Sequence, residues 1–569
     1  MIKIKNHLFI AGFLFLLLSC NQSIVKKDFT LHIIETTDVH GQFFQYDLVN
    51  QKNSTGSLSQ VFSYVEMLRN QDSTNVILLD NGDILQGNPV VYYGNFIAKD
   101  SIHPLAKMLN WMKYDAQTIG NHDIEAGHGV YDSYQNQLDF PLLAANAINA
   151  KTGECYFKPY TIIERQGVKI AILGLITPAI PNWLPESLWA GMYFEDMVVS
   201  AQKWMKIIQE KEQPDLVIGL FHAGLDATYG GANVDAPLNE NACLLVAENV
   251  PGFDIVFSGH DHREAVFNIK NIDSADVLIM NAGAYASNLA LADINFVWNK
   301  ELNQYQKFFF GSIIPMDSIE PSEEFVNTFS PWFDSTQLYV SQSITELSKE
   351  IKAEESLLGS SPFIDLIHQA QLDLSGADIS FAAPFSINAV LAKGNFTQAD
   401  LFNLYRYENY LCTIKLSGSE IKKYLEFSTD LWFDTIANYR NNWLLLEPEN
   451  ESNKHQFVKL KNPYYNFDSA AGILYKISAS NPRGSRVNIL KMADGSIFEM
   501  DKIYTVVMNS YRANGGGGHL LKGVGLSKEE LKSRMINCWK LDFRNMLGEW
   551  LSQQKKPFAP EVLNNWSIN

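Results

Sequence analysis

Five short strings in the first half of the chain combine histidine, aspartate and asparagine with glycine. Imidazole and carboxylate groups favour Zn, Mn, Fe or Co as metal partners, and none of the five strings contains a cysteine. Each string alone could be a turn or a packed core feature, so the prediction rests on their number and order. The strings are Thr37–Gly41, Asp80–Asp83, Gly120–Asp123, Phe221–Gly224 and Gly259–His262. Together they indicate a metal site.

Four of these strings directly follow a short apolar run that predicts a strand. The predicted strands of this region are Leu31–Thr36, Val76–Leu79, Val168–Leu175, Leu216–Phe221, Ile255–Phe257 and Val277–Asn281. Apolar residues at helical spacing in Ser57–Asn70 and Met197–Glu212 predict helices between them. Such alternation is typical of an α/β domain, in which loops converge at the carboxyl ends of the strands. The polar side chains are therefore expected at one edge of a sheet.

Beyond its first 28 residues, the chain is predicted to consist of three segments. The α/β domain covers residues 29–315, a helical connector covers 316–358, and a second domain covers 359–569. The connector is inferred from Ser322–Glu355, which is polar, charged and free of glycine. In the second domain we expect helices at Phe363–Leu374, Ser419–Ser428 and Lys528–Met535, and strands at Leu411–Leu416, Leu474–Ala479 and Tyr504–Met508.

The first residues have the pattern of an export signal. Lys3 and Lys5 precede the apolar run Leu8–Leu18, which is too short to span a bilayer as a helix. The ending Leu17-Leu18-Ser19-Cys20 resembles a bacterial lipobox. This resemblance implies a signal peptide over residues 1–19, a lipid on Cys20 and a tether over 20–28. The protein would then be extracytoplasmic and anchored to a bacterial membrane. A plain secretory peptide with an incidental cysteine is the alternative.

Charge and cysteine content narrow the range of partners. The chain has 45 Lys and Arg against 63 Asp and Glu, a formal net charge of −18. Such a chain has no cationic surplus for binding a nucleic-acid polymer. A small anion can still bind where metal ions or a local arginine supply positive charge. The five cysteines show no paired spacing, so neither a disulfide framework nor a structural zinc site is expected.

The ordered set of strings resembles the calcineurin-like metallophosphoesterase superfamily. Within it, the chain is similar to the bacterial 5′-nucleotidase and 2′,3′-cyclic-nucleotide phosphodiesterase family over essentially its whole mature length. The resemblance implies a four-layer α/β/β/α metallophosphoesterase domain followed by a mixed α+β nucleotide-binding domain. It also implies two divalent metal ions (Zn, Mn, Co or Fe) as cofactors and a nucleotide as substrate.

The resemblance assigns roles to individual positions. It implies that Asp38, His40 and His262 hold one metal, that Asn121, His222 and His260 hold the other, and that Asp83 bridges them. His122 matches the catalytic histidine, which would stabilise charge on the phosphate or protonate the leaving group. Glu125 stands where relatives often carry Asp to orient that histidine. The two cations would convert a bridging water into a hydroxide that attacks phosphorus in line.

Two tyrosines of the second domain are candidates for substrate binding. Tyr407 and Tyr511 fall where relatives clamp the base between two aromatic rings, and Asn121 and His122 would contact the phosphate. Stacking of a base on an aromatic ring contributes about 1–3 kcal/mol and tolerates any base. The alternative is that both tyrosines are core residues, as in many chains this rich in aromatic side chains.

Departures from the 5′-nucleotidase pattern favour one branch of the family. Ala382–Asn388 replaces an Asn-Gly-Gly-Gly-Ile-Arg string, and Gly517 replaces an Asp in the glycine loop. The strings that resemble the cyclic-phosphodiesterase/3′-nucleotidase branch are Ala383–Ser386, Asn509–Ala513 and Ile176–Trp183. A 5′-nucleotidase or UDP-sugar hydrolase stays the alternative. A non-catalytic nucleotide-binding lipoprotein is a third hypothesis, but it should have lost some of the metal ligands.

Overall fold

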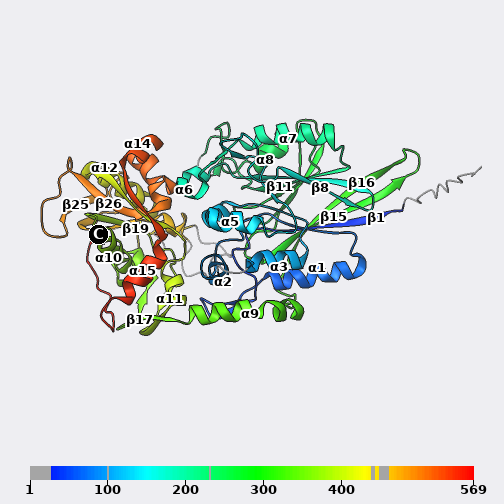
Figure 1. Cartoon of the computed structure of the whole chain (residues 1–569). Coiled ribbons are helices and arrows are strands. Elements are labelled where there is room, and N and C mark those ends of the chain that lie inside the picture. Colours follow the sequence, from blue (N-terminus) through cyan, green and yellow to red (C-terminus); the bar gives the residue numbers. More distant parts are fainter. Residues whose placement is uncertain (1–26, 99–101, 230–231, 438–441, 448–459) are drawn as a thin grey trace, which may run out of the picture.

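The computed structural model describes residues 27–98, 102–229, 232–437, 442–447 and 460–569. The predicted signal peptide, the candidate lipidation site Cys20 and most of the predicted tether lie outside the described residues. Figure 1 shows two bodies side by side, joined along one edge by the long helix α9 (Glu323–Val340). No helix in the described part of the chain is both long and apolar enough to cross a membrane.

The N-terminal body contains two six-stranded sheets. The first has the order β16-β15-β1-β4-β5-β6 and the second the order β13-β14-β12-β11-β9-β8. The strands of the first are β1 (Phe29–Thr36), β4 (Val76–Asp80), β5 (Ala116–Thr118), β6 (Leu142–Leu143), β15 (Asn288–Asn299) and β16 (Gln304–Pro315). Those of the second are β8 (Tyr160–Arg165), β9 (Val168–Ile176), β11 (Leu216–His222), β12 (Ile255–Ser258), β13 (Ala265–Lys270) and β14 (Asp276–Asn281).

The two sheets pack face to face between two layers of helices. One apolar cluster joins Ile33 and Ile77 of the first sheet to Ile172 and Leu220 of the second. Helices α1 (Leu58–Asp72) and α3 (Pro104–Met112) cover one outer face, and α7 (Met197–Lys211) and α8 (Cys243–Asn249) cover the other (Figure 1). Strands β9 and β11 are almost wholly buried. A strand that is covered on both faces needs a continuous apolar sequence, and this is why both strands consist mainly of apolar residues. All six strands and both helices predicted for this region are present.

The predicted helical connector is only partly helical, and this corrects the sequence analysis. Helix α9 ends at Val340, and the chain then forms strands β17 (Ser343–Leu347) and β18 (Ile351–Lys352). These pair with β21 (Gly394–Thr397) and β20 (Val390–Leu391) of the C-terminal body. Ile344, Leu347 and Ile351 are buried there. Their burial against the second domain outweighs the helical preference of the polar residues around them.

The C-terminal body is built on a mixed five-stranded sheet of order β23-β19-β26-β22-β27. Its strands are β19 (Ile379–Ala382), β22 (Tyr410–Ser417), β23 (Ser469–Ala471), β26 (Ile503–Asn509) and β27 (Met535–Asp542). The main helices are α10 (Pro362–Ser375), α11 (Gln398–Leu404), α12 (Gly418–Trp432), α14 (Lys528–Arg534) and α15 (Phe543–Ser552). A three-stranded sheet adds β24 (Ile473–Ile477), β25 (Val487–Met492) and β28 (Trp566–Ile568). The three helices and three strands predicted here are all present.

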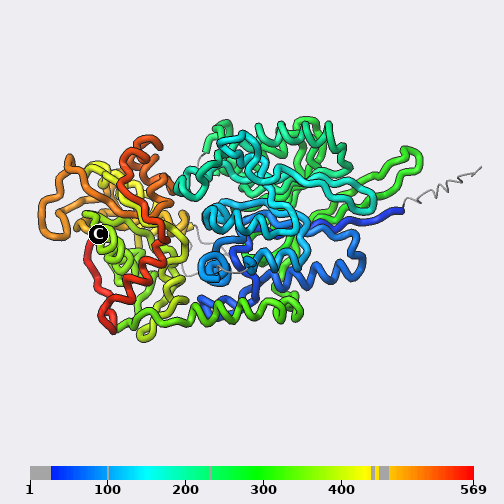
Figure 2. The backbone as a smooth tube through the Cα atoms, in the orientation of Figure 1, coloured from blue at the N-terminus to red at the C-terminus, as the bar shows by residue number. Residues whose placement is uncertain are grey.

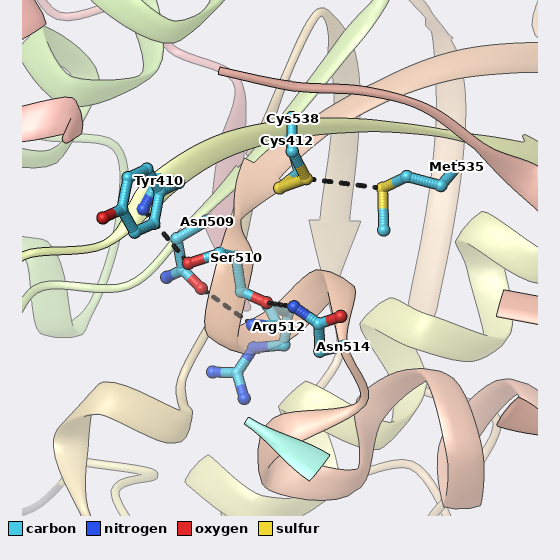
Figure 3. The surroundings of a disulfide bond; sticks show 8 residues. All are labelled: Tyr410, Cys412, Asn509, Ser510, Arg512, Asn514, Met535 and Cys538. Carbon is cyan, nitrogen blue, oxygen red and sulfur yellow. Dashed lines mark hydrogen bonds between the residues drawn. A yellow bond between two sulfur atoms is a disulfide. The ribbon is translucent and has the colours of Figure 1, made fainter. Parts of the chain in front are cut away.

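A disulfide in the C-terminal body corrects the expectation drawn from the cysteine spacing. Cys412 of β22 and Cys538 of β27 are bonded, with their Cα atoms 4.1 Å apart and a separation of 126 positions in sequence (Figure 3). The two residues lie opposite each other in the antiparallel register of these strands. Sequence spacing gives no sign of this, because the pairing exists only once the strands are adjacent. Cys155 and Cys243 are free thiols.

The start of the described chain lies at the end of the molecule that faces away from the C-terminal body (Figure 2). It runs beside the hairpin formed by β15 and β16. The Trp298 backbone N–H donates to Asp28 Oδ1 at 2.8 Å, and the Tyr305 hydroxyl donates to the Lys27 carbonyl at 3.2 Å.

Candidate metal and nucleotide site

The predicted polar strings converge at the carboxyl edge shared by the two sheets. Asp38 and His40 follow β1, Asp83 follows β4, Asn121 begins helix α4 (Asn121–Glu125) after β5, His222 ends β11, and His260 and His262 follow β12. Their potential ligand atoms form two groups, one of Asp38, His40 and His262 and one of Asp83, His222 and His260. Within each group these atoms lie within 4.8 Å of one another. Asn121 joins the second group, with its Oδ1 3.2 Å from His222 Nε2.

The ligand atoms of each group face one another directly. In the first group, His262 Nε2 is 3.2 Å from His40 Nε2 and 3.3 Å from Asp38 Oδ1. In the second group, His222 Nε2 is 3.1 Å from Asp83 Oδ2. Four of these six residues are buried, whereas His260 is partly exposed and His262 is exposed. Such convergence of imidazole nitrogens and carboxylate oxygens is the donor chemistry that divalent transition metals need.

The orientation of two histidines fits this use. His40 Nδ1 faces the Gln86 carbonyl at 3.1 Å, and His222 Nδ1 faces the Asn81 carbonyl at 2.6 Å. A carbonyl can only accept, so Nδ1 carries the hydrogen in both rings, and Nε2 is the atom directed at the cluster, where it offers a lone pair whenever the ring is neutral. Burial lowers the pKa of His40 to about 3, which keeps that ring neutral. Burial also acts to lower the pKa of His222, but Asp83 outweighs it and raises that pKa to about 10.

Five of the seven candidate ligands have a left-handed backbone conformation, which residues other than glycine rarely adopt. Their φ values are 49° for Asp38, 48° for His40, 55° for Asp83, 71° for His260 and 57° for His262. Contacts between loops hold this backbone: the Asp38 N–H donates to Gly82 O at 2.9 Å and the His40 N–H donates to Asp83 O at 3.0 Å. Strained backbone of this kind collects at functional sites and persists because the surrounding structure fixes it.

Asp123 fixes two of the ligand-bearing loops together, a role that the sequence analysis did not assign. Its carboxylate accepts four backbone N–H groups, from Gly120 at 2.7 Å, Asp83 at 3.0 Å, Ile84 at 2.9 Å and Leu85 at 2.7 Å. The loops touch so closely that a Cβ on Gly120 would lie 2.2 Å from Asp83 Oδ1. An acid three residues after the N-cap glycine of a short helix was the available sequence signal.

His122 and Glu125 lie beside the two metal-candidate groups. His122 Nδ1 is 2.6 Å from Glu125 Oε2, and its imidazole is 5.4 Å from that of His40 between ring centroids. The contact forms because residues three apart share one face of helix α4. Burial acts to lower the pKa of His122, but Asp83 and Glu125 raise it to about 9. The longer arm of Glu125 therefore does reach the histidine, and the catalytic role of the pair stays a prediction.

The two predicted base-binding tyrosines are half-buried in the C-terminal body. Tyr407 follows helix α11 and packs edge-on against Phe385, with ring centroids 5.4 Å apart. Tyr511 lies in the short helix α13 (Ser510–Ala513), directly after β26, with its ring against the backbone of Gly516. No ring contact joins Tyr407 to Tyr511 among the described residues. Neither tyrosine is fully enclosed in a core.

A third tyrosine belongs to the same region and was missed from the sequence. Tyr465, in the single turn Tyr464–Asn466, packs against the cluster that contains Tyr407. Burial and then the neighbouring Tyr511 raise the pKa of Tyr465, and Tyr229 and Glu240 of the N-terminal body act on it in the same direction. No motif surrounds Tyr465, so only the folded chain reveals its position.

A buried ion pair fixes the loops that carry these rings. Arg512, which is 1% exposed, donates through Nε and Nη2 to Asp468 at 2.9 Å each. It also donates to the Tyr465 carbonyl at 2.7 Å and to the Gly516 carbonyl at 2.8 Å. Gly517 has φ +68°, and a Cβ there would lie 2.0 Å from Arg512 Nη1. The guanidinium thus fills the space that a side chain at position 517 would need.

The metal-candidate groups and the tyrosines face each other across the boundary between the two bodies. Glu240 Oε1 lies 3.1 Å from His260 Nε2. Burial raises the pKa of Tyr511, and the charge of the same Glu240 carboxylate acts in the same direction. On its other side, the His260 ring stacks on Trp183 at 5.5 Å. The exposed pair Glu186–Lys532 joins the bodies at 2.7 Å near this place.

The remaining histidines of the described chain join neither metal-candidate group. His103, His368 and His519 are buried, whereas His32 and His128 are partly exposed and pair with Asp293 and Asp132. These five match none of the sequence strings and are structural or surface residues. His7 and His455, which also match no string, lie outside the described residues.

Comparison with known proteins identifies the two domains. The calcineurin-like phosphoesterase family model matches residues 31–264, and the 5′-nucleotidase C-terminal domain model matches residues 341–523. The chain is 26% identical to the trifunctional nucleotide phosphoesterase YfkN of Bacillus subtilis over 95% of its length, but covers only 39% of that longer protein. It is also 26% identical to the 2′,3′-cyclic-nucleotide 2′-phosphodiesterase/3′-nucleotidase of Yersinia enterocolitica, covering 95% of this chain and 88% of the relative.

A solved structure supports the same fold over nearly the whole chain. The putative 5′-nucleotidase of Staphylococcus aureus aligns with a TM-score of 0.76 and 21% identity, covering 95% of this chain and 99% of the other. The comparisons and the fold together show a two-domain phosphoesterase, in which a calcineurin-like phosphoesterase domain precedes a 5′-nucleotidase C-terminal domain. The predicted family and fold class are thereby confirmed.

Proposed function

We propose that this protein is an extracytoplasmic phosphohydrolase that uses two divalent metal ions to act on nucleotides, as a 2′,3′-cyclic-nucleotide 2′-phosphodiesterase and 3′-nucleotidase. The observation that carries the proposal is the convergence of all seven expected ligands opposite three tyrosines of the second domain. The match to a relative named for both activities, over 95% of this chain, supports it. Such a complete ligand set argues against a non-catalytic nucleotide-binding lipoprotein.

The proposed metal assignment follows the two groups. Asp38, His40 and His262 would hold one ion, Asn121, His222 and His260 would hold the other, and the buried Asp83 would lie between them. Asp83 fits this place because its negative charge is close enough to stabilise the protonated forms of both His222 and His40. Two bound cations would lower the pKa of a bound water and neutralise phosphate oxygens, which would allow so acidic a protein to bind an anion. The donor set suits Zn, Mn, Co or Fe.

The chain's own side chains would complete the reaction. Glu125 holds Nδ1 of His122, so that Nε2 can donate to a phosphate oxygen or to the departing sugar oxygen. Asn121 would contact the same phosphate. Tyr407 and Tyr511, with Tyr465 beside Tyr511, would stack on the base and hold the ester in line with the attacking water.

The glycine loop supports the cyclic and 3′ branch over a 5′-nucleotidase. Relatives of the 5′ type carry an Asp where this chain has Gly517, and here the guanidinium of Arg512 occupies that space. A side chain at this position would therefore have to displace Arg512 from its present contacts. The 5′-nucleotidase alternative is separated by the substrate assay below.

We also propose that the mature protein is tethered outside the cytoplasm. Residues 1–19 would be removed and Cys20 would carry the lipid. The first described residues lie at the end of the molecule far from the nucleotide-binding domain (Figure 2). A disulfide such as Cys412–Cys538 persists in oxidising compartments and supports this location. In this proposal the metallophosphoesterase domain covers 29–315, the connecting segment 316–358 and the nucleotide-binding domain 359–569. A lipid anchor and a small nucleotide, not a nucleic-acid polymer, are the proposed partners.

The test is phosphate release by the chelator-stripped protein with Zn, Mn, Co or Mg added back. We expect metal-restored hydrolysis that favours 2′,3′-cyclic AMP and 3′-AMP over 5′-AMP. A clear preference for 5′-AMP would instead place the protein with the 5′-nucleotidases. No hydrolysis of any of the three nucleotides with any metal would contradict the proposed function.

A further inference from the structure

A short segment of the N-terminal body lies between the candidate ligand His40 and the second domain. It runs from Gln86 to Tyr92 and includes the short helix α2 (Pro89–Tyr92). On its inner side, the Gln86 carbonyl faces His40 Nδ1 at 3.1 Å, and the Asn88 N–H donates to the His40 carbonyl at 3.1 Å. The segment thus holds both the ring and the backbone of His40.

Residues of the C-terminal body contact the outer side of this segment at both ends of the segment, Gln86 and Tyr92. Gln86 Nε2 donates to Glu408 Oε2 at 2.8 Å, across 322 residues of sequence. At the other end, the guanidinium of Arg544 lies over the Tyr92 ring at 4.6 Å, and Asn545 Nδ2 donates to the Tyr92 hydroxyl at 2.5 Å. All these side-chain contacts cross the boundary between the bodies.

Glu408 is fixed from its own side of the boundary. Its Oε1 is paired with Arg544, whose Cζ lies 3.8 Å from the ring centroid of Phe402. Glu408 is 7% exposed, Gln86 is 6% exposed and Arg544 is 1% exposed. A buried, charge-assisted hydrogen bond of this kind holds its partners in one geometry more firmly than a surface contact does. Glu408 also follows Tyr407 directly, so it marks the position of the nucleotide-binding loop.

We propose that Glu408 is a positioning residue through which the second domain holds His40 in its metal-binding orientation. The path runs from Glu408 Oε2 to the Gln86 side chain and from the Gln86 carbonyl to His40 Nδ1. The docked second domain therefore contributes to metal affinity at the group of Asp38, His40 and His262. This inference rests on the metal role of His40 in the proposed function. Outer groups that orient a metal-bound histidine typically change metal affinity by about 10- to 100-fold.

The test is a calorimetric titration of the chelator-stripped full chain with Mn²⁺. Gln86→Met removes the amide but keeps the carbonyl that faces His40, and we expect it to weaken one Mn²⁺ binding step about 10-fold while the other step is unchanged. Gln60→Met is the matched control, because Gln60 is a buried glutamine of the same body that donates to the Met316 and Ile319 carbonyls instead. We expect wild-type affinities for this control.

A second variant changes the residue of the C-terminal body that bonds to Gln86. Glu408→Gln removes the pair with Arg544, and we expect it to weaken the same Mn²⁺ step. The control is Glu420→Gln, which removes a pair with Arg534 elsewhere in the same domain. The double variant of Gln86 and Glu408 should be no weaker than the weaker single variant, because both act through one path. If Glu408→Gln does not fold, the titration of Gln86→Met decides alone.

Wild-type Mn²⁺ affinity in a folded Gln86→Met protein would overturn the inference, as would equal weakening in Gln86→Met and Gln60→Met. The titration uses no nucleotide, so it is independent of the substrate assay. A protein that binds Mn²⁺ in this pattern but hydrolyses no nucleotide would contradict the proposed function and leave the inference standing.

Discussion

The two halves of the site are built by different means. In the N-terminal body, the candidate ligands are placed by the backbone itself, since Asp38, His40 and Asp83 all have positive φ and sit where strands end. In the C-terminal body, Tyr407 and Tyr511 are absent from the positive-φ residues. Their positions depend instead on buried ion pairs, with Arg512 bonded to Asp468 and Glu408 bonded to Arg544.

This difference predicts which substitutions should disturb each half of the site. A strained backbone held by several loops keeps its shape when one ligand side chain is exchanged, so a ligand variant should lose metal without losing the fold. An aromatic surface held by buried charges should move when one charge is disturbed. The following experiments test that distinction.

The largest effect is expected at Asp83, the carboxylate that would lie between the two ions. Asp83→Asn should lower bound metal, measured by elemental analysis, and reduce turnover by about 10³-fold or more, because metal ions supply several kcal/mol of charge stabilisation. Asp115→Asn is the control, since Asp115 is a largely buried carboxylate of the same body that bonds to Leu78 N and Arg165. Normal metal content in the Asp83 variant would show that the site is not organised around this residue.

A smaller loss, with metal retained, is expected at His122. His122→Ala should reduce kcat by about 10²- to 10⁴-fold, the usual contribution of a positioned proton donor, while both ions stay bound. His128→Ala removes a histidine six positions further along that pairs with Asp132, and should leave kcat near the wild-type value. Full activity of the His122 variant would remove this residue from the mechanism.

The aromatic half can be disturbed through its glycine loop. In Gly517→Asp the new side chain would collide with Arg512, so the loops that carry Tyr465 and Tyr511 should move. Losing the stacking contribution of about 1–3 kcal/mol should lower kcat/KM for nucleotides by roughly 5- to 150-fold. Hydrolysis of bis(p-nitrophenyl) phosphate, which has no base, should be unaffected.

The matched control for this change is Gly484→Asp. Gly484 also has a positive φ, of +78°, but nothing lies within 4 Å of its Cβ position, so it carries the backbone cost without the collision. Equal losses of kcat/KM for the nucleotide and for the base-free ester would mean that Gly517→Asp acts on the metal site instead of on base binding.

The smallest effect concerns acid stability, which should differ between the halves. Burial lowers the pKa of His368 and of His519 to about 3 in the C-terminal body, and that of His103 to about 4 in the N-terminal body. Each folded pKa lies below the unfolded value near 6.5, so the unfolded chain takes up protons first as the pH falls. Stability should therefore decline below about pH 6.5, by up to ~1.4 kcal/mol per pH unit for each histidine.

Thermal unfolding between pH 7.5 and 5 checks this expectation. His368→Gln removes one titrating group while keeping a partner for the hydroxyls of Ser380 and Ser469. The variant should lose less stability than the wild type as the pH falls. Parallel curves for the two proteins would show that protonation of His368 does not drive acid unfolding.

Local sequence patterns were sufficient to predict that the candidate metal ligands converge. Aspartate, asparagine and histidine stand directly after apolar strand sequences, and parallel strands bring their carboxyl ends to one edge. The same logic failed for Ser343–Lys352, where polar residues suggest helix and pairing with distant strands decides otherwise. It also gave no sign of Tyr465 or of Asp123 as a link between loops.

Residue types and their spacing were enough to predict which side chains could bind metal, that two domains follow one another, and which families these domains resemble. The folded chain was needed to see that Cys412 meets Cys538, that Arg512 fills the space beside Gly517, and that Glu408 reaches the Gln86 that holds His40. The reason is that period and residue type encode contacts made along one strand or helix. Contacts between residues hundreds of positions apart depend on how whole elements pack, and no local pattern records that packing.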